Sequence, residues 1–95
     1  MLRKDTFKTD VIFRVDTSKD FEGTVFALFP YDVDVINGLV VTYQHIGQHS
    51  YADYKHCLKT SRRAKLAEFK DLRVELEGLG YNIRTIKGKY YKTDD

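Results

Sequence analysis

The residues best suited to chemistry gather in one stretch, Tyr43 to Cys57, which holds all three histidines and the only cysteine of the chain. A thiolate and several imidazoles are ligands that suit zinc, and the candidates are His45, His49, His56 and Cys57. Their spacing differs from the standard zinc pattern, in which two short ligand pairs are separated by a longer loop. The alternative is structural, with His45 and His49 bonded to backbone, His56 solvated and Cys57 in the core. We predict no bound metal and no cofactor.

A catalytic arrangement would need a nucleophile, a base and an orienting group. Ser50 or Cys57, together with His49 and Asp53, supplies these side-chain types within the same stretch. Ser50 is better suited to starting a helix, because Asp53 three residues later completes a pair that resembles a capping box. The sequence contains no nucleophile elbow, Gly-rich phosphate loop or paired-carboxylate motif. The sequence therefore favours a protein without catalytic residues. Of the three functional hypotheses that the sequence suggests, an enzyme or a small metal site is the one we favour least.

Basic and aromatic side chains in the second half of the chain suggest a second hypothesis, binding of a single-stranded nucleic acid. Lysine and arginine contact phosphates, and tyrosine stacks on bases. The candidates are Arg62, Arg63, Lys65, Tyr81, Arg84, Lys87, Lys89, Tyr90, Tyr91 and Lys92. Four acidic residues between Glu68 and Glu77 occupy the same region and argue against a helix that enters a groove.

A contact surface for another protein is the hypothesis that we favour. Tyrosine and histidine combine large rigid rings with polar tips, which is typical of protein interfaces. The candidate contact residues are Tyr43, Gln44, His45, Gln48, His49, Tyr51 and Tyr54. The same side chains could instead fasten a sheet to its helices. We predict a small accessory or modulatory protein with one protein partner.

Composition limits the choice of fold and compartment. Ninety-five residues, 42% of them apolar, suffice for one core, so we predict a single domain over residues 1–95 with flexible ends at 1–9 and 90–95. One cysteine excludes an internal disulfide, and no segment resembles a signal peptide or membrane span. We therefore expect a cytoplasmic protein without a membrane partner. The net charge of +2 is small, although acids concentrate early in the chain and bases late.

Strand patterns dominate the first half of the chain. Val11–Asp16 has the period-two pattern of a strand with one buried face, with Val11, Phe13 and Val15 on one side and Ile12, Arg14 and Asp16 on the other. Thr24–Phe29 is apolar on both faces, which favours a central position in a sheet. Pro30 should end this second strand, because proline cannot donate to a ladder. After a turn, Leu39–Ile46 is expected to be the third strand, with His45 on the face of Tyr43.

Helical spacing begins after this third strand. A short helix is expected from about Tyr51 to Lys59, and a second helix starts between Arg62 and Lys65 and carries Phe69 and Leu72 in the core. Gly78 and Gly80 offer left-handed caps, and Tyr81–Ile86 should be the last strand. The predicted fold is α+β, with an antiparallel-rich sheet of about four strands in the order β-β-β-α-α-β, covered on one face by two helices.

Several short segments share a pattern with a known family: Phe29-Pro30, Thr42 to Tyr54, Asp71-Leu72 and Glu75 to Tyr81. Over about residues 25–86 the chain resembles small bacterial proteins encoded on plasmids, conjugative elements and phages, with a shared Tyr-Gln-His-x-Gly-Gln-His-Ser-x-Ala-Asp-Tyr motif. The resemblance implies a mobile-element or phage protein and carries no particular activity. Family members have a proline-bearing segment where Arg62–Lys65 stands in this chain.

Overall fold

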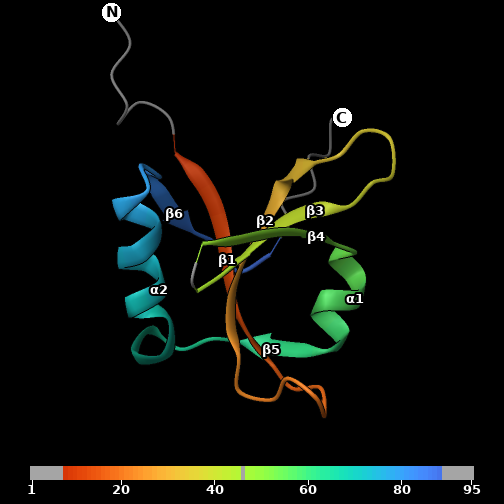
Figure 1. Cartoon of the computed structure of the whole chain (residues 1–95), viewed down its shortest axis with the longest axis horizontal. Helices are drawn as coiled ribbons and strands as arrows, with labels where there is room; N and C mark the ends of the chain where they lie inside the picture. The colour runs from red at the N-terminus through yellow and green to blue at the C-terminus, as the bar shows by residue number, and fades with distance from the viewer. Residues whose placement is uncertain (1–7, 46, 89–95) are drawn as a thin grey trace, which may run out of the picture.

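The computed structural model describes residues 8–45 and 47–88 (Figure 1). Its elements are β1 (Thr9–Asp16), β2 (Val25–Val33), β3 (Val40–Gln44), β4 (Gln48–Ala52), α1 (Tyr54–Lys59), β5 (Ser61–Arg63), α2 (Leu66–Gly78) and β6 (Ile83–Thr85). The ends predicted to be flexible lie outside the described residues, apart from residue 8 and Thr9, the first residue of β1. Neither described helix has the length and apolar character needed to cross a membrane.

One sheet contains all six of these strands, in the order β4-β3-β2-β1-β5, while β6 lies parallel to the start of β1. The other neighbouring strands are antiparallel. The α+β class and the central position of β2 are therefore confirmed, but four strands were too few. The additional strands are β4, which was expected to lead into a helix, and β5, which is too short to show a period.

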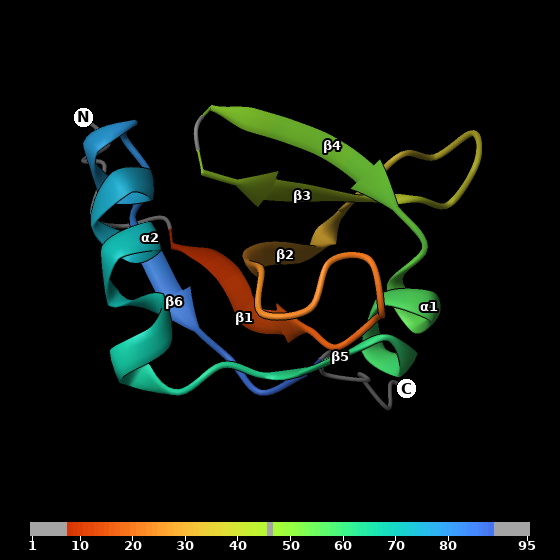
Figure 2. The same cartoon turned by 60° about the horizontal axis from the view of Figure 1, so that its bottom comes forward.

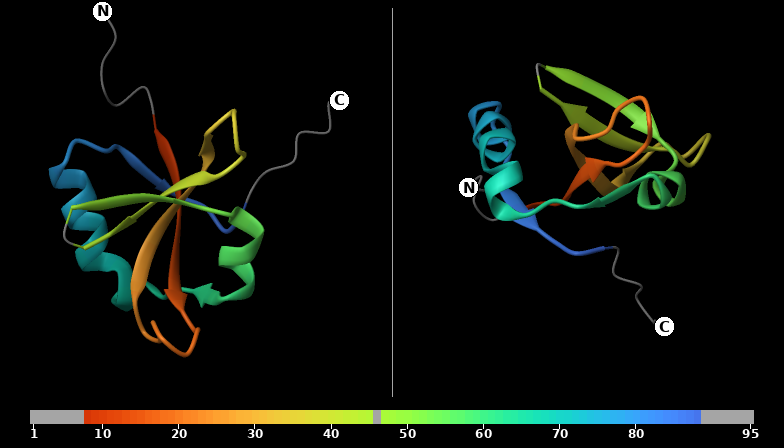
Figure 3. Two further views of the ribbon diagram at one scale, coloured as in Figure 1. Left: turned by 45° about the vertical axis from the view of Figure 1, so that its right-hand side comes forward. Right: turned by 90° about the horizontal axis from the view of Figure 1, so that it is seen from below.

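The sheet buries both of its faces. Val11, Phe13 and Val15 of β1 share one cluster with Leu72 and Leu76 of α2. On the other face, Ile12 joins a cluster that also contains Phe26, Leu28, Val40 and Cys57 of α1. Figure 3 shows α1 and α2 on opposite sides of the sheet. The prediction of two helices on one face is thus wrong, because strands that are apolar on both faces need a cover on each.

The hairpin of β3 and β4 replaces the expected start of the first helix. Gly47 has a φ of 64°, a left-handed conformation that glycine adopts without strain and that lets the chain reverse at once. Tyr43 then pairs with His49 across the two strands. As a result α1 starts at Tyr54, and Asp53 is its cap, with a side-chain oxygen that accepts from the His56 N–H at 3.1 Å. The capping role predicted for Ser50 is wrong.

Pro30 does not end β2, which continues to Val33. The register between β2 and β3 shifts between Phe29 and Val33, so the ladder is interrupted where proline has no N–H to offer. The Pro30 side chain is fully buried at this irregularity.

Helix α2 follows the prediction in its interior and at its end. Leu72 and Leu76 are buried, and Phe69 is half-buried and stacks on Phe13 with ring centroids 4.4 Å apart. The helix ends in a left-handed Gly80 with a φ of 107°, while the Tyr81 N–H donates to the Leu76 carbonyl at 3.2 Å. This end places Tyr81 beside the β3–β4 hairpin.

Candidate functional site

The β3–β4 hairpin divides the predicted protein-contact residues between the two faces of the sheet. Tyr43, His45 and His49 lie on the side of α2, where they contact residues of that helix or of the chain just after it. Gln44 and Gln48, a cross-strand pair, lie on the side of α1 and border a cavity there. The seven candidates therefore do not form one continuous surface, and Tyr54 at the start of α1 packs against the core of the α1 side.

Glu75 of α2 is the centre of the polar contacts on the α2 side. The Tyr43 hydroxyl donates to one oxygen of this carboxylate, and His45 Nδ1 contacts the other. The same hydroxyl accepts from the Gly47 N–H at 2.9 Å. The bonds from Tyr43 and His45 lower the pKa of Glu75, while the bond to Glu75 and burial raise the pKa of Tyr43. With only 1% of its surface exposed, Tyr43 fastens the hairpin to α2.

His49 of β4 makes a second contact on the α2 side, with Tyr81 in the chain after α2. Its Nε2 lies 2.9 Å from the Tyr81 hydroxyl, and its ring meets the Tyr43 ring edge-on with centroids 4.7 Å apart. Tyr81 also stacks on Phe29 at 5.3 Å, and burial raises the pKa of Tyr81. Sequence reasoning did not identify Glu75 or Tyr81 as members of this cluster. The available signals were a carboxylate beside the apolar stripe of α2 and a tyrosine directly after the Gly80 cap.

The residues proposed for catalysis or metal binding do not come together. Ser50 and His49 are neighbours in a strand, so their side chains point to opposite faces, and Asp53 is engaged as a helix cap. Cys57 lies in the core of the α1 side, and burial raises the pKa of its thiol, which disfavours the reactive thiolate. Within residues 8–45 and 47–88, no group of three or more His, Cys, Asp or Glu side chains is placed to hold a metal ion.

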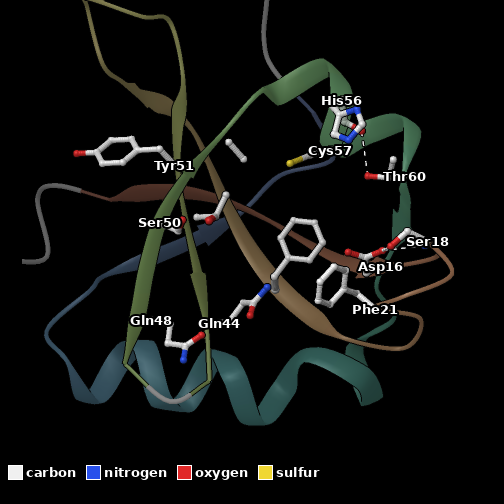
Figure 4. Close-up of a pocket in the computed structure, with 13 residues that line it drawn as sticks. Asp16, Ser18, Phe21, Gln44, Gln48, Ser50, Tyr51, His56, Cys57 and Thr60 are labelled. Carbon is white, nitrogen blue, oxygen red and sulfur yellow. Dashed lines mark hydrogen bonds between the residues drawn. The ribbon is translucent and has the colours of Figure 1, made fainter.

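A cavity of about 440 Å³ lies on the α1 side of the hairpin (Figure 4). Its lining combines two aromatic rings, Phe21 and Phe26, with the polar side chains of Gln44, Gln48 and Ser50. Phe21 is 62% exposed and stands at the opening. In Figure 4 the Tyr51 ring points away from the cavity, so successive residues of β4 present different surfaces to a partner.

Two of the arginines proposed to bind nucleic acid form ion pairs. Arg62 makes two bonds to Glu68, of 2.9 and 2.6 Å, and these lower the pKa of Glu68 to about 2. Arg84 bonds to Asp10 at 2.6 Å. Arg63, Lys65 and Lys87 are exposed and Tyr81 is half-buried, whereas the remaining candidates, Lys89, Tyr90, Tyr91 and Lys92, lie outside the described residues. Two of the five described basic candidates thus have their charge partly neutralised.

The outer edge of β4 has no neighbouring strand in the described part of the chain. An edge strand leaves a row of backbone N–H and C=O groups free to pair with another chain. Sequence reasoning missed this edge, because it placed a helix over the second half of β4.

Comparisons of the chain with protein-family models, with curated proteins and with solved structures give no match. The resemblance to mobile-element proteins therefore stays a prediction.

Proposed function

We propose that this chain is a non-enzymatic accessory protein that binds an extended segment of another protein as an added strand on the outer edge of β4. In strand addition, backbone hydrogen bonds provide affinity, and pockets for alternate side chains provide specificity. The partner would be a protein of the host or of the mobile element that the sequence pattern suggests.

The observation that supports this proposal is the difference between the two edges of the sheet. Natural sheets protect their edges with short strands, charged side chains, prolines or bulges. β5, at one edge, is three residues long and carries Arg62 and Arg63. β4, at the other edge, is five residues long and contains no lysine, arginine, acidic residue or proline. An unprotected edge of this length is typical of a surface that pairs with a partner strand.

Side chains on both faces of β4 could select the partner sequence. Tyr51 is 59% exposed and offers a rigid aromatic ring on one face. On the other face, Gln48 and Ser50 border the cavity that contains Phe21 and Phe26. Because the side chains of an added strand alternate between the faces, every second one would point toward this cavity. We expect an apolar or aromatic ligand residue at that position.

The hairpin is held in place before any partner arrives. Tyr43 of β3 and His45 of the turn after it bond to Glu75 of α2, and His49 of β4 bonds to Tyr81. A rigid edge loses little conformational entropy when a strand is added, so more of the backbone hydrogen bonding contributes to affinity.

The test is selection of binders from a random peptide library, followed by amide hydrogen exchange on the complex. We expect a selected peptide to slow exchange across Gln48–Ala52 and to lose at least about tenfold in affinity against Tyr51→Lys, since a charge on an edge strand opposes pairing. Val74→Lys is the matched control, because Val74 is 66% exposed on α2, far from β4 in the sequence, and its replacement should leave affinity unchanged. Protection confined to other elements, or failure to select any peptide, would contradict strand addition.

A generic single-stranded DNA in the same assay tests the nucleic-acid hypothesis. If Arg63 and Lys87 contacted phosphates, affinity would fall by about one logarithmic unit per contact for each tenfold rise in salt. We expect little binding at physiological ionic strength. A tight, salt-sensitive complex that is insensitive to Tyr51→Lys would replace the protein-partner proposal.

A further inference from the structure

The turn between β2 and β3 presents two aliphatic side chains to solvent. Val35 is 95% exposed and Ile36 is 91% exposed, at the tip of a loop that projects from the body in Figure 1. Single exposed apolar side chains are common, but adjacent ones on a projecting tip indicate a contact surface. We call residues 35 and 36 the apolar tip.

Hydrogen bonds hold this tip in shape. The Asp34 N–H donates to the Leu39 carbonyl, and the Gly38 N–H donates to the Asp34 carbonyl, both at 2.8 Å. The Asp34 carboxylate accepts from the Ile36 N–H at 2.8 Å. The apolar tip is therefore a formed turn, so presenting it to a partner costs little ordering entropy.

Acidic side chains accompany the apolar tip. Asp32 is exposed, Asp34 is half-buried, and both precede the two aliphatic residues. Carboxylates at this position would be repelled by an anionic surface and attracted by a basic one. A partner surface that complements the apolar tip would therefore be an apolar recess with a basic rim.

The same chain contains such a recess at the start of α2. It has a volume of about 620 Å³, and Phe13, Ala64, Leu66, Phe69 and Ile86 supply its apolar lining. Three basic residues also line it: Arg63, Lys65 and Lys87. None of these three side chains forms an ion pair with a carboxylate of the described residues. We call this recess the basic-rimmed hollow.

The hollow cannot hold the tip of its own chain. Figures 1 and 2 both place the β2–β3 turn on the side of the molecule away from the start of α2. Figure 2 also shows the β5–α2 connection beside the chain that follows β6, and both segments contribute to the lining of the hollow.

We propose that the apolar tip of one copy docks into the basic-rimmed hollow of a second copy. Val35 and Ile36 would lie against Phe69 and Leu66, the latter 67% exposed in the free chain, while the carboxylates face the basic rim. The two surfaces differ, so the contact is heterologous, and each added copy leaves one tip and one hollow free. Such a contact produces chains or closed rings. It is independent of strand addition at β4, which uses other residues.

Sedimentation velocity over a range of protein concentrations tests this contact. We expect the mass of the wild type to increase with concentration and to fall at high salt, because the rim and the tip attract each other by charge. Ile36→Asp and Leu66→Asp should each weaken association by about tenfold or more, since each replaces a buried aliphatic contact by a charge. Val74→Asp changes an exposed apolar residue outside the hollow and should associate like the wild type.

The decisive experiment mixes the two defective variants. Ile36→Asp retains an intact hollow and Leu66→Asp an intact tip, so the mixture can form one productive contact and should give a 1:1 dimer that does not grow. A wild type that stays monomeric at every concentration, association unchanged in both variants, or a mixture that stays monomeric would overturn the proposal. Val35→Asp and Lys87→Glu repeat the test if circular dichroism shows that either first variant is unfolded.

Discussion

Replacing His49 with alanine tests whether the hairpin edge is held by α2 and the chain that follows it. The substitution removes the bond of 2.9 Å from Nε2 to the Tyr81 hydroxyl and the edge-on contact with the Tyr43 ring. A hydrogen bond of this kind contributes about 0.5–1.5 kcal/mol net, and an aromatic pair contributes a similar amount. The His49 side chain is exposed, which reduces both contributions, so we expect a loss of about 1–2 kcal/mol.

Urea unfolding followed by circular dichroism measures this loss, and each kcal/mol corresponds to about 4–8 °C in Tm for a domain of this size. His56→Ala is the matched control. His56 is exposed, and it bonds to Asp53 and Thr60 through its backbone atoms, so its replacement should change stability by at most about 0.5 kcal/mol.

A double-mutant cycle with Tyr81→Phe isolates the hydrogen bond. If the bond forms, the double variant should be more stable than the sum of the single effects predicts, by about 0.5–1.5 kcal/mol. A coupling near zero, together with a His49→Ala variant as stable as His56→Ala, would refute the tie between β4 and Tyr81. The edge would then be less rigid than the proposed function requires.

Three further predictions concern the core, the carboxylates and metal. Leu76→Ala should cost about 2–5 kcal/mol in urea unfolding, because this side chain is fully buried, whereas the exposed Val74→Ala should cost far less. The pKa values of Glu75 and Glu68 in the folded protein lie below the ordinary 4.5. The stabilisation from these ionised carboxylates is therefore present above pH 4.5 and is lost as the pH falls, for Glu68 down to about 2. In acid titrations of the free energy of unfolding, Glu75→Gln and Glu68→Gln should each show a smaller loss of stability than the wild type. Purified protein should hold no stoichiometric zinc, and metal analysis that finds one ion per chain, lost on replacing His49 or Cys57, would contradict this.

The sequence predicted those parts of the fold in which the apolar pattern is long and unambiguous. α2 shows a clear helical period, and its buried residues, Leu72 and Leu76, follow it. The apolar residues of β1 and of the first part of β2 are almost all buried. The sequence did not predict that each face of the sheet is covered by a helix, because Arg14 and Asp16 suggested that one side of β1 faces solvent. Arg14 is instead half-buried, and its guanidinium donates to Ser61 Oγ at 2.8 Å and to the Ser61 carbonyl at 2.6 Å.

The candidate site shows why local patterns were insufficient. Ser50 and Asp53 have the spacing of a capping box, but the tight turn at Gly47 and the pairing of Tyr43 with His49 keep the chain extended until Asp53. Tertiary pairing therefore overrode a local helix signal. The partners of the histidine cluster, Glu75 and Tyr81, lie some thirty residues away, and no spacing in the sequence connects them to it.

The two proposed surfaces differ in a way that solution mass can separate. If the unprotected β4 edge paired with the β4 edge of another copy, the contact would use the same surface twice, and association would stop at a dimer. Docking of the apolar tip into the basic-rimmed hollow uses two different surfaces and continues beyond two copies unless a ring closes. Tyr51→Lys should abolish the first kind of association and leave the second intact, while Ile36→Asp should do the reverse. If the wild type forms a dimer of constant mass and only Tyr51→Lys abolishes it, self-association uses the β4 edge. If the mass of the wild type increases with concentration and only Ile36→Asp prevents this, β4 remains free for a partner strand.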